Sequence, residues 1–361
     1  MAIDHSKSYL EPDSISMLRE FKEGKPIGES GRVEHLEDQF SWKRAFVNCW
    51  TGRPNFGKST FLQFMAVNKS KHDNWKWCVW SPEMVSSDKD NSGKVYKTAT
   101  DIYDELIHIY TGENPYKHFR DRYGISQMSE DKYLESILWV QDRFYVVEPK
   151  DKRYKHLIDN YMYMYEKYGV DGWIIDPFRS VRYDQLGGTL DYVLSQIFDE
   201  FKEAAILTNS SVNFIAHPKG DNDPFKREKG GTIIGYKPVN QYNLLGGSAW
   251  DNAMDGIFSV HRPYKHLNDN DPATYLFHHK QRKKHLVGNT GVYKKIEYDP
   301  KTSRFYFDGH CPIDGSFKQP IVRDERGKPL PNQPIPTDRG FGNIQEIVFN
   351  HSDEMLDDAP F

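Results

Sequence analysis

One short stretch near the start of the chain has the residue types needed to hold phosphate groups. Residues 52–60, GRPNFGKST, satisfy the pattern G-x-x-x-x-G-K-[ST]. Backbone N–H groups of such a loop attract phosphate oxygens, the lysine reaches the β- and γ-phosphates, and the first hydroxyl binds Mg²⁺. We therefore expect ATP or a similar nucleotide here, with Mg²⁺ held partly by Ser59. The expected nucleotide contacts are Gly52, Arg53, Pro54, Asn55, Phe56, Gly57, Lys58, Ser59 and Thr60.

The segments beside this loop support the interpretation. The apolar run before it, residues 44–50, predicts a buried strand, and residues 61–67 after it predict a helix. Strand, glycine-bounded loop and helix are the context that the mechanism requires, whereas a chance match would lack it. A phosphate-binding loop is therefore the preferred interpretation.

Hydrolysis of a nucleotide needs two further groups, a carboxylate beside the metal ion and a group that activates water. Asp176 ends the apolar segment 172–175, and ligands bind at this end of strands in open α/β sheets, so we expect it to hold the metal ion. Glu83 follows the strand expected at 75–80 and would lie beside the γ-phosphate. The alternatives are that Asp176 caps a helix starting at Pro177 and that Glu83 is an ordinary surface residue.

Strands and helices are expected to alternate between about residues 43 and 309, which indicates an α/β fold. Leu190, Val193, Ile197, Phe201 and Ala205 fall on one face of a helix. Helices of this length between strands predict a mostly parallel twisted sheet with helices on both faces, and antiparallel strands at one edge. The expected strands are Arg44–Trp50, Trp75–Trp80, Phe144–Val147, Gly172–Asp176, Val212–Ala216, Gly256–Val260, Tyr275–His279, Gly291–Tyr298 and Arg304–Phe307.

Composition narrows the class of protein. The net charge of −4 neither requires nor excludes nucleic acid, which a local cluster of Lys and Arg could bind. No apolar run is long enough to span a membrane, and the first residues lack the apolar core of a signal peptide. Cys49, Cys78 and Cys311 are far apart and lack zinc-site spacing, so we expect a reducing, cytoplasmic setting, including that of a phage protein in a bacterial host.

Two terminal segments differ from the central one. We expect residues 1–42 to form an arm and linker, with an amphipathic stretch at Ser14–Phe21. Residues 43–309 form the expected core domain. The proline-rich residues 310–361 are expected to form an extended tail with an acidic Pro-Phe tip.

Six motifs, taken in order, resemble the RecA-fold motor domain of DnaB-family replicative helicases, including phage primase–helicases and Twinkle-type helicases. The matching segments are Gly52–Thr60, Ser81–Met84, Trp173–Asp176, Phe214–His217, Gly246–Arg262 and Lys280–Tyr298. The resemblance covers about residues 21–307. It implies a RecA-like P-loop fold and an ATP-dependent, ring-forming DNA helicase, expected as a hexamer, that translocates on single-stranded DNA during replication.

The resemblance also implies roles for individual residues. Glu83 is the expected catalytic base, and His217 senses the γ-phosphate. Lys280 and Arg282 reach the nucleotide of a neighbouring subunit, where the arginine stabilises transition-state charge. Arg262 and Tyr298 enclose the adenine. The alternatives are a solvated basic strand edge for Lys280 and Arg282, and an ordinary strand residue for Tyr298.

Loops that line the ring channel of the family are matched by two basic segments of this chain. The expected DNA contacts are Arg179, Arg182, Lys219, Lys226, Arg227 and Lys229. Lysine and arginine contacts to phosphate give sequence-independent, salt-sensitive binding to a single strand. The alternative for each is a solvated loop charge.

The chain also departs from the family. We expect no primase domain in it, and about 60 residues between Glu83 and Phe144 suggest a helical insertion. The tip at Asp357–Phe361 is similar to the C-terminal tip of bacterial single-stranded-DNA-binding proteins, which implies docking to a replication partner; an ordinary acidic tail is the alternative. Two rival functions remain open, a RecA-like recombinase or mediator and a non-motor ATP-dependent loader or scaffold.

Overall fold

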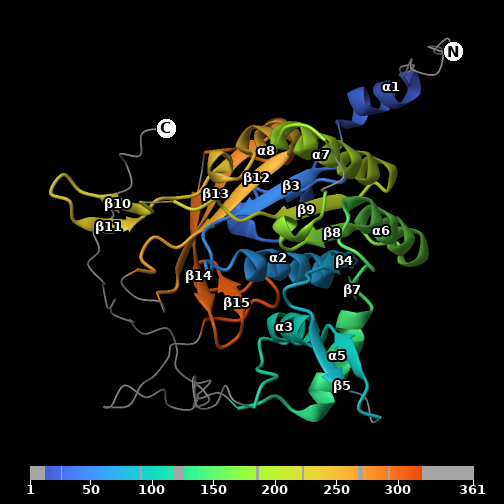
Figure 1. Ribbon diagram of the computed structural model, residues 1–361, viewed down its shortest axis with the longest axis vertical. Coiled ribbons are helices and arrows are strands. Elements are labelled where there is room, and N and C mark those ends of the chain that lie inside the picture. Colours follow the sequence, from blue (N-terminus) through green and yellow to red (C-terminus); the bar gives the residue numbers. More distant parts are fainter. Residues whose placement is uncertain are drawn as a thin grey trace.

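The computed structural model describes residues 13–25, 27–89, 92–117, 126–183, 187–221, 223–266, 271–291 and 293–318. A nine-stranded sheet with the order β15-β14-β13-β12-β3-β9-β8-β4-β7 forms its centre (Figure 1). The parallel part comprises β12 (Gly256–His261), β3 (Val47–Thr51), β9 (Ser211–Ile215), β8 (Gly172–Ile175), β4 (Trp77–Trp80) and β7 (Phe144–Val146). The antiparallel part adds β13 (Ala273–Gln281), β14 (Tyr293–Asp299) and β15 (Arg304–Tyr306). This architecture confirms the predicted mostly parallel sheet with antiparallel strands at one edge.

Side chains from the central strands enter two separate cores, one on each face of the sheet. In β4, for example, Trp77 and Val79 belong to one core and Cys78 and Trp80 to the other. The alternation follows from the two-residue repeat of a strand, and a sheet covered on both faces favours apolar residues at most positions. β4 follows this pattern throughout, whereas β3 and β9 each bury an asparagine, and Asn48 donates a hydrogen bond to the Asn213 side-chain oxygen at 3.3 Å.

Helices cover both faces, as predicted. Figure 1 shows α7 (Leu190–Leu207) and α8 (Gly247–Ala253) on one side of the sheet, and α2 (Lys58–Asp73) and α3 (Thr100–Thr111) on the other. The Thr189 hydroxyl accepts a hydrogen bond from the backbone N–H of Tyr192 and so caps α7. The remaining longer helices are α5 (Glu130–Gln141) and α6 (Tyr154–Tyr168).

The core begins earlier than the predicted boundary at residue 43. Val33, Leu36, Phe40 and Trp42 are all buried in the core that contains α2. The sequence does not reveal these four apolar residues, because they are separated by polar residues in a short irregular segment without periodicity. That segment contains β1 (Glu29–Ser30), η2 (Glu34–Leu36) and β2 (Ser41–Trp42).

The amphipathic stretch at the N-terminus forms a helix, α1 (Ser14–Glu23), that projects from the body (Figure 1). Asp13 caps it by accepting hydrogen bonds from the backbone N–H groups of Ile15 and Ser16. None of its residues is buried, and the Phe21 side chain is 86% exposed.

The folded part also ends later than the predicted boundary at residue 309. Cys311 and Ile313 are buried in the same core as α2, and Arg304 forms an ion pair with Asp314 at 2.6 Å. Two apolar anchors in a proline- and glycine-containing turn give no periodic signal, so composition alone misplaced this end. The acidic tip at Asp357–Phe361 lies outside the described residues.

The expected insertion before Phe144 is helical in α3 and α5 but also contains a hairpin that was not predicted. This hairpin pairs β5 (Ser86–Lys89) with β6 (Val95–Thr98). A second hairpin, β10 (Phe225–Arg227) with β11 (Ile233–Tyr236), replaces part of a predicted loop and projects beside the sheet (Figure 1). Short elements complete the described part: η3 (Phe178–Ser180), η4 (Gln241–Asn243) and α9 (Lys284–Val287).

Cys49, Cys78 and Cys311 are buried and free, Cys311 within the segment that we expected to form an extended tail. Within the described ranges, no helix combines the length and apolar character that crossing a membrane requires.

Candidate nucleotide site

The phosphate loop lies at the carboxyl end of β3, and its backbone has the shape that close contact with phosphate requires. Gly57 has φ of 85° and caps the start of α2. Gly52 has φ of 144°, and a Cβ there would lie 2.4 Å from the Val260 carbonyl oxygen. Both positions therefore require glycine. Gly57 is needed for its backbone conformation, and Gly52 is needed both for its conformation and because a Cβ would not fit. The N-terminus of α2 is open to an anion.

Lys58 is the cation of this loop, and it is held inside the site. Its side chain is only 5% exposed, and its Nζ donates to the Arg53 carbonyl oxygen at 3.1 Å. Burial lowers its pKa to about 8, although the charge of Asp176 opposes that shift. A buried ammonium with one neutral acceptor is poised to interact with an incoming anion.

Asp176 follows β8 and lies against the phosphate loop. Its carboxylate accepts a hydrogen bond from the Ser59 hydroxyl, and its backbone N–H donates to the Trp80 carbonyl oxygen at 2.9 Å. Burial raises its pKa to about 6, against the opposing effects of Ser59 and Lys58. A hydroxyl and a carboxylate at one point are the oxygen ligands that Mg²⁺ prefers, with phosphate oxygens and waters completing its shell. The pair therefore fits the expected metal ion.

Glu83 and Arg179 form an ion pair at the same edge of the sheet, with 2.7 Å between Oε1 and Nη2. Arg179, which was expected at DNA, thus lies at the nucleotide site. His217 follows β9 nearby: burial lowers its pKa to about 4, and the charges of Lys58 and Arg179 lower it further. The groups expected to bind phosphate, hold the metal ion, activate water and sense the γ-phosphate therefore converge.

Glu105 is a carboxylate of this site that the sequence did not reveal. It lies on α3 and accepts a hydrogen bond from the Thr60 hydroxyl at 3.3 Å. Burial raises its pKa to about 7, and the charge of Asp176 contributes to the shift. The sequence around Glu105 does not distinguish it from other carboxylates on helices. Glu105 reaches the site only because α3 packs on α2.

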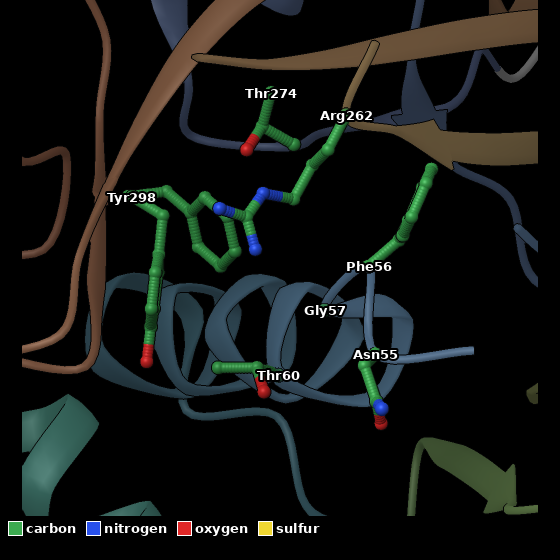
Figure 2. Close-up of a pocket in the computed structure, with 8 residues that line it drawn as sticks. Asn55, Phe56, Gly57, Thr60, Arg262, Thr274 and Tyr298 are labelled. Atoms are coloured by element: carbon green, nitrogen blue, oxygen red, sulfur yellow. The ribbon is translucent and has the colours of Figure 1, made fainter. Parts of the chain in front are cut away.

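A cavity of about 240 Å³ adjoins the phosphate loop, beside the start of α2. Arg262 and Tyr298, which we expected to enclose the adenine, both line this cavity; in Figure 2 the Arg262 side chain extends across it and the Tyr298 ring points toward α2. Arg262 Nη2 donates to the Asp271 carbonyl oxygen at 2.6 Å, which fixes the guanidinium at the cavity. The other residues that line the cavity are Asn55, Phe56, Gly57, Thr60, Thr274 and Phe305. Thr274 and Phe305 were not predicted to belong to the nucleotide site.

Lys280 and Arg282 lie at the opposite end of the sheet from the phosphate loop. Gly256, the first residue of β12, pairs with Gln281, whereas Ser259 pairs with Thr51 at the start of the loop. The strand that carries Lys280 is not at the edge of the sheet, because β13 lies between β12 and β14, and Arg282 follows the end of β13.

Within its own chain Arg282 rests on Asp255, with 3.5 Å between Nη1 and Oδ1, and donates to the Asn252 carbonyl oxygen. Its side chain remains 45% exposed. Lys280 is half-buried, and burial lowers its pKa, with the charge of Arg282 adding to the shift.

The other basic residues expected at DNA lie outside the group formed by Lys58, Asp176, Glu83 and His217. Arg182 is exposed beside α6, where its backbone N–H donates to the Lys152 carbonyl oxygen at 2.7 Å. Lys219 is exposed and lines a second cavity of about 270 Å³ together with Arg53. The exposed residues Lys226, Arg227 and Lys229 belong to the β10–β11 hairpin and its turn.

Comparison with known proteins gives one relative in sequence. No protein-family model matches the chain. It is 24% identical over 256 residues to the Twinkle homolog protein, chloroplastic/mitochondrial, of Arabidopsis thaliana, a match that covers 69% of this chain and 32% of the relative. The matched part is thus about a third of the relative's length.

Two solved structures are similar in fold. One is a separately solved ATPase domain, which superimposes with a TM-score of 0.61 at 14% identity, covering 84% of this chain and 99% of that one. The other, a DnaB-like replicative helicase described with its interactions with primase, gives a TM-score of 0.59 at 16% identity, covering 83% and 68%. The fold is therefore RecA-like, as predicted, and it is the fold of DnaB-like helicase ATPase domains.

Proposed function

We propose that this chain, which has the fold of the DnaB-like helicase ATPase domains and a Twinkle homolog as a relative, is an ATP-dependent DNA helicase motor. The observation that carries the proposal is the convergence of Lys58, Ser59, Asp176, Glu83 and His217 at the carboxyl edge of the sheet. This set contains the parts that P-loop hydrolysis requires.

Each residue has a role that its surroundings support. Lys58 binds the β- and γ-phosphates, and the backbone N–H groups at the start of α2 hold their oxygens. Glu83 accepts the proton of the attacking water, and its ion pair with Arg179 holds the carboxylate at the site. Ser59 and Asp176 would hold Mg²⁺, which would neutralise developing phosphate charge.

The site needs a second copy of the chain to become complete. Lys280 and Arg282 lie level with the start of β12, away from the phosphate loop of their own chain. In a ring they would face the phosphate loop of a neighbouring subunit. An arginine supplied in this way couples hydrolysis to assembly. The exposed apolar face of α1, including Ile15 and Phe21, would pack on an adjacent subunit.

Single-stranded DNA would bind the basic hairpin and the loops that follow β8 and β9. Lys226, Arg227 and Lys229 extend from the hairpin, where phosphate contacts would be independent of sequence. Arg182 and Lys219 are exposed and could add contacts, whereas Arg179 serves the nucleotide site.

The test is a paired measurement of single-stranded-DNA-stimulated ATP hydrolysis and of forked-duplex unwinding by the same preparation. We expect both, with Glu83→Gln abolishing both and Glu113→Gln, a distant exposed carboxylate, affecting neither. Hydrolysis without unwinding would favour the recombinase or the loader. Absence of hydrolysis in a folded preparation would reject the motor.

A further inference from the structure

The β10–β11 hairpin depends on contacts at its base for its position. Its strands have three and four residues, and an isolated two-stranded hairpin of this size is marginal in water. Tyr236, the last residue of β11, stacks on Phe225 with ring centroids 4.8 Å apart. The same ring meets the edge of Phe56 at 5.3 Å. Since Phe56 belongs to the phosphate loop, the hairpin rests directly on the nucleotide-binding element.

Arg53 is a second link between the phosphate loop and the hairpin. Its Nε donates to the Lys237 carbonyl oxygen and its Nη2 to the Pro224 carbonyl oxygen, both at 3.3 Å. The guanidinium also pairs with Asp221 at 3.1 Å and lies 5.6 Å from the centroid of the Tyr236 ring. One largely buried side chain therefore joins the loop to the residues that enter and leave the hairpin.

The loop after β12 closes the arrangement from the other side. The Tyr236 backbone N–H donates to the Pro263 carbonyl oxygen at 3.0 Å, and Lys265 Nζ donates to the Asn55 carbonyl oxygen at 2.9 Å. Pro263 directly follows Arg262, which lines the cavity expected to hold the base. Both parts of the nucleotide site thus contact the base of the hairpin.

We propose that Tyr236 is a positioning residue that couples occupancy of the phosphate loop to the placement of the hairpin's basic side chains. The inference rests on the proposed function, because it requires both nucleotide and single-stranded DNA to bind. Phe56 and Arg53 belong to the loop proposed to hold phosphate, so a rearrangement of that loop on nucleotide binding would move the surface on which Tyr236 lies. By linkage, DNA bound to the hairpin changes nucleotide affinity by the same factor.

The experiment compares the dissociation constant for single-stranded DNA with and without a non-hydrolysable ATP analogue. For the unmodified chain we expect the two constants to differ by about 5- to 150-fold. In Tyr236→Ala the ratio should fall toward one, while hydrolysis without DNA is retained. Tyr236→Phe should restore the ratio, since the contacts described involve the ring and the backbone. Tyr192→Ala, at an exposed tyrosine of α7, is the matched control.

The outcomes separate this inference from the proposed function. A thermally stable Tyr236→Ala variant that keeps the full ratio would overturn the coupling and leave the motor intact. If the unmodified chain hydrolyses ATP and binds DNA with an affinity independent of nucleotide, the coupling is again rejected. Failure to bind DNA or to hydrolyse ATP at all would remove the proposed function and the coupling together.

Discussion

The two ends of the parallel sheet differ in how complete they are. At the carboxyl end, the Lys58 cation and the Asp176 carboxylate are buried together and influence each other's pKa. At the amino end, the Arg282 side chain is 45% exposed. Measured along β12, Arg282 lies about 10 Å from the level of the phosphate loop. One end is thus assembled by folding, whereas we propose that the other acts on a second copy of the chain.

Asp255 explains how the exposed end is stable before assembly. Its buried carboxylate accepts from the Val47 backbone N–H at 2.8 Å and pairs with Lys202 at 2.5 Å. Removing the last partner of a buried charge is strongly destabilising, but Asp255 keeps these two if Arg282 leaves. Arg282 can therefore move to a neighbouring subunit without an uncompensated charge remaining in its own.

The largest effect that the comparison predicts is that of Arg282→Ala. Hydrolysis by the assembled protein should fall by about 10³- to 10⁵-fold, the usual contribution of an arginine supplied in trans. ATP affinity of the isolated chain should not change, because Arg282 is remote from its own phosphate loop. Lys284→Ala, an exposed lysine of α9, is the control. If Arg282→Ala weakened ATP binding by the isolated chain as strongly as it slowed hydrolysis, Arg282 would act on the nucleotide of its own chain. The contrast between the two ends of the sheet would then be wrong.

The substitution Lys58→Ala affects the nucleotide site at the carboxyl end of the parallel sheet. We expect hydrolysis to fall by about 100- to 1,000-fold, typical of removing one preorganised donor to transition-state charge, together with nucleotide affinity. Lys71→Ala, at the other end of α2, should be close to unmodified protein. Fluorescent-nucleotide titration and steady-state hydrolysis measure the two effects, and unchanged nucleotide affinity would contradict the assignment.

Acid should loosen the β12–β13 pair that connects the two ends. Burial lowers the pKa of His261 to about 3 and that of His278 to about 4. Below the unfolded value near 6.5 the unfolded chain binds protons that the folded chain excludes, so stability is full above that pH and is lost as pH falls toward 4. At pH 5, each histidine should lower the free energy of unfolding by about 2 kcal/mol relative to its value above pH 6.5.

Urea midpoints between pH 7.5 and 5 test this effect. His278→Gln should flatten the pH dependence, and the exposed His285→Gln should leave it as it is. Identical slopes for both variants would show that His278 is not among the groups responsible.

The smallest effect concerns the hairpin at the carboxyl end. Lys226→Ala combined with Lys229→Ala should weaken single-stranded-DNA binding and reduce the slope of log K against log salt by about 1.4, or about 0.7 per lost phosphate contact. The pair Lys155→Ala and Lys167→Ala on α6 is the control. Unchanged binding isotherms across a salt series would exclude the hairpin as a DNA contact.

Sequence reasoning succeeded where structure depends on neighbours in the chain. The phosphate loop, the strand leading to Asp176 and the face of α7 follow from local spacing and periodicity, and each was placed within a few residues.

Features that depend on packing between distant segments were missed. Glu105 joins the nucleotide site only because α3 packs on α2, and Phe40 enters the core from a segment without periodicity. The hairpin at Phe225–Tyr236 has few apolar residues, and its strands are held by the phosphate loop rather than by their own propensity.

The shared site is tested most directly by mixing Lys58→Ala and Arg282→Ala subunits and measuring ATP hydrolysis. In randomly mixed rings, about a quarter of the interfaces join an intact phosphate loop to an intact Arg282. We predict that the mixture regains activity that neither variant has alone. A mixture that forms rings by light scattering, exchanges subunits and remains inactive would contradict a site divided between two copies of the chain.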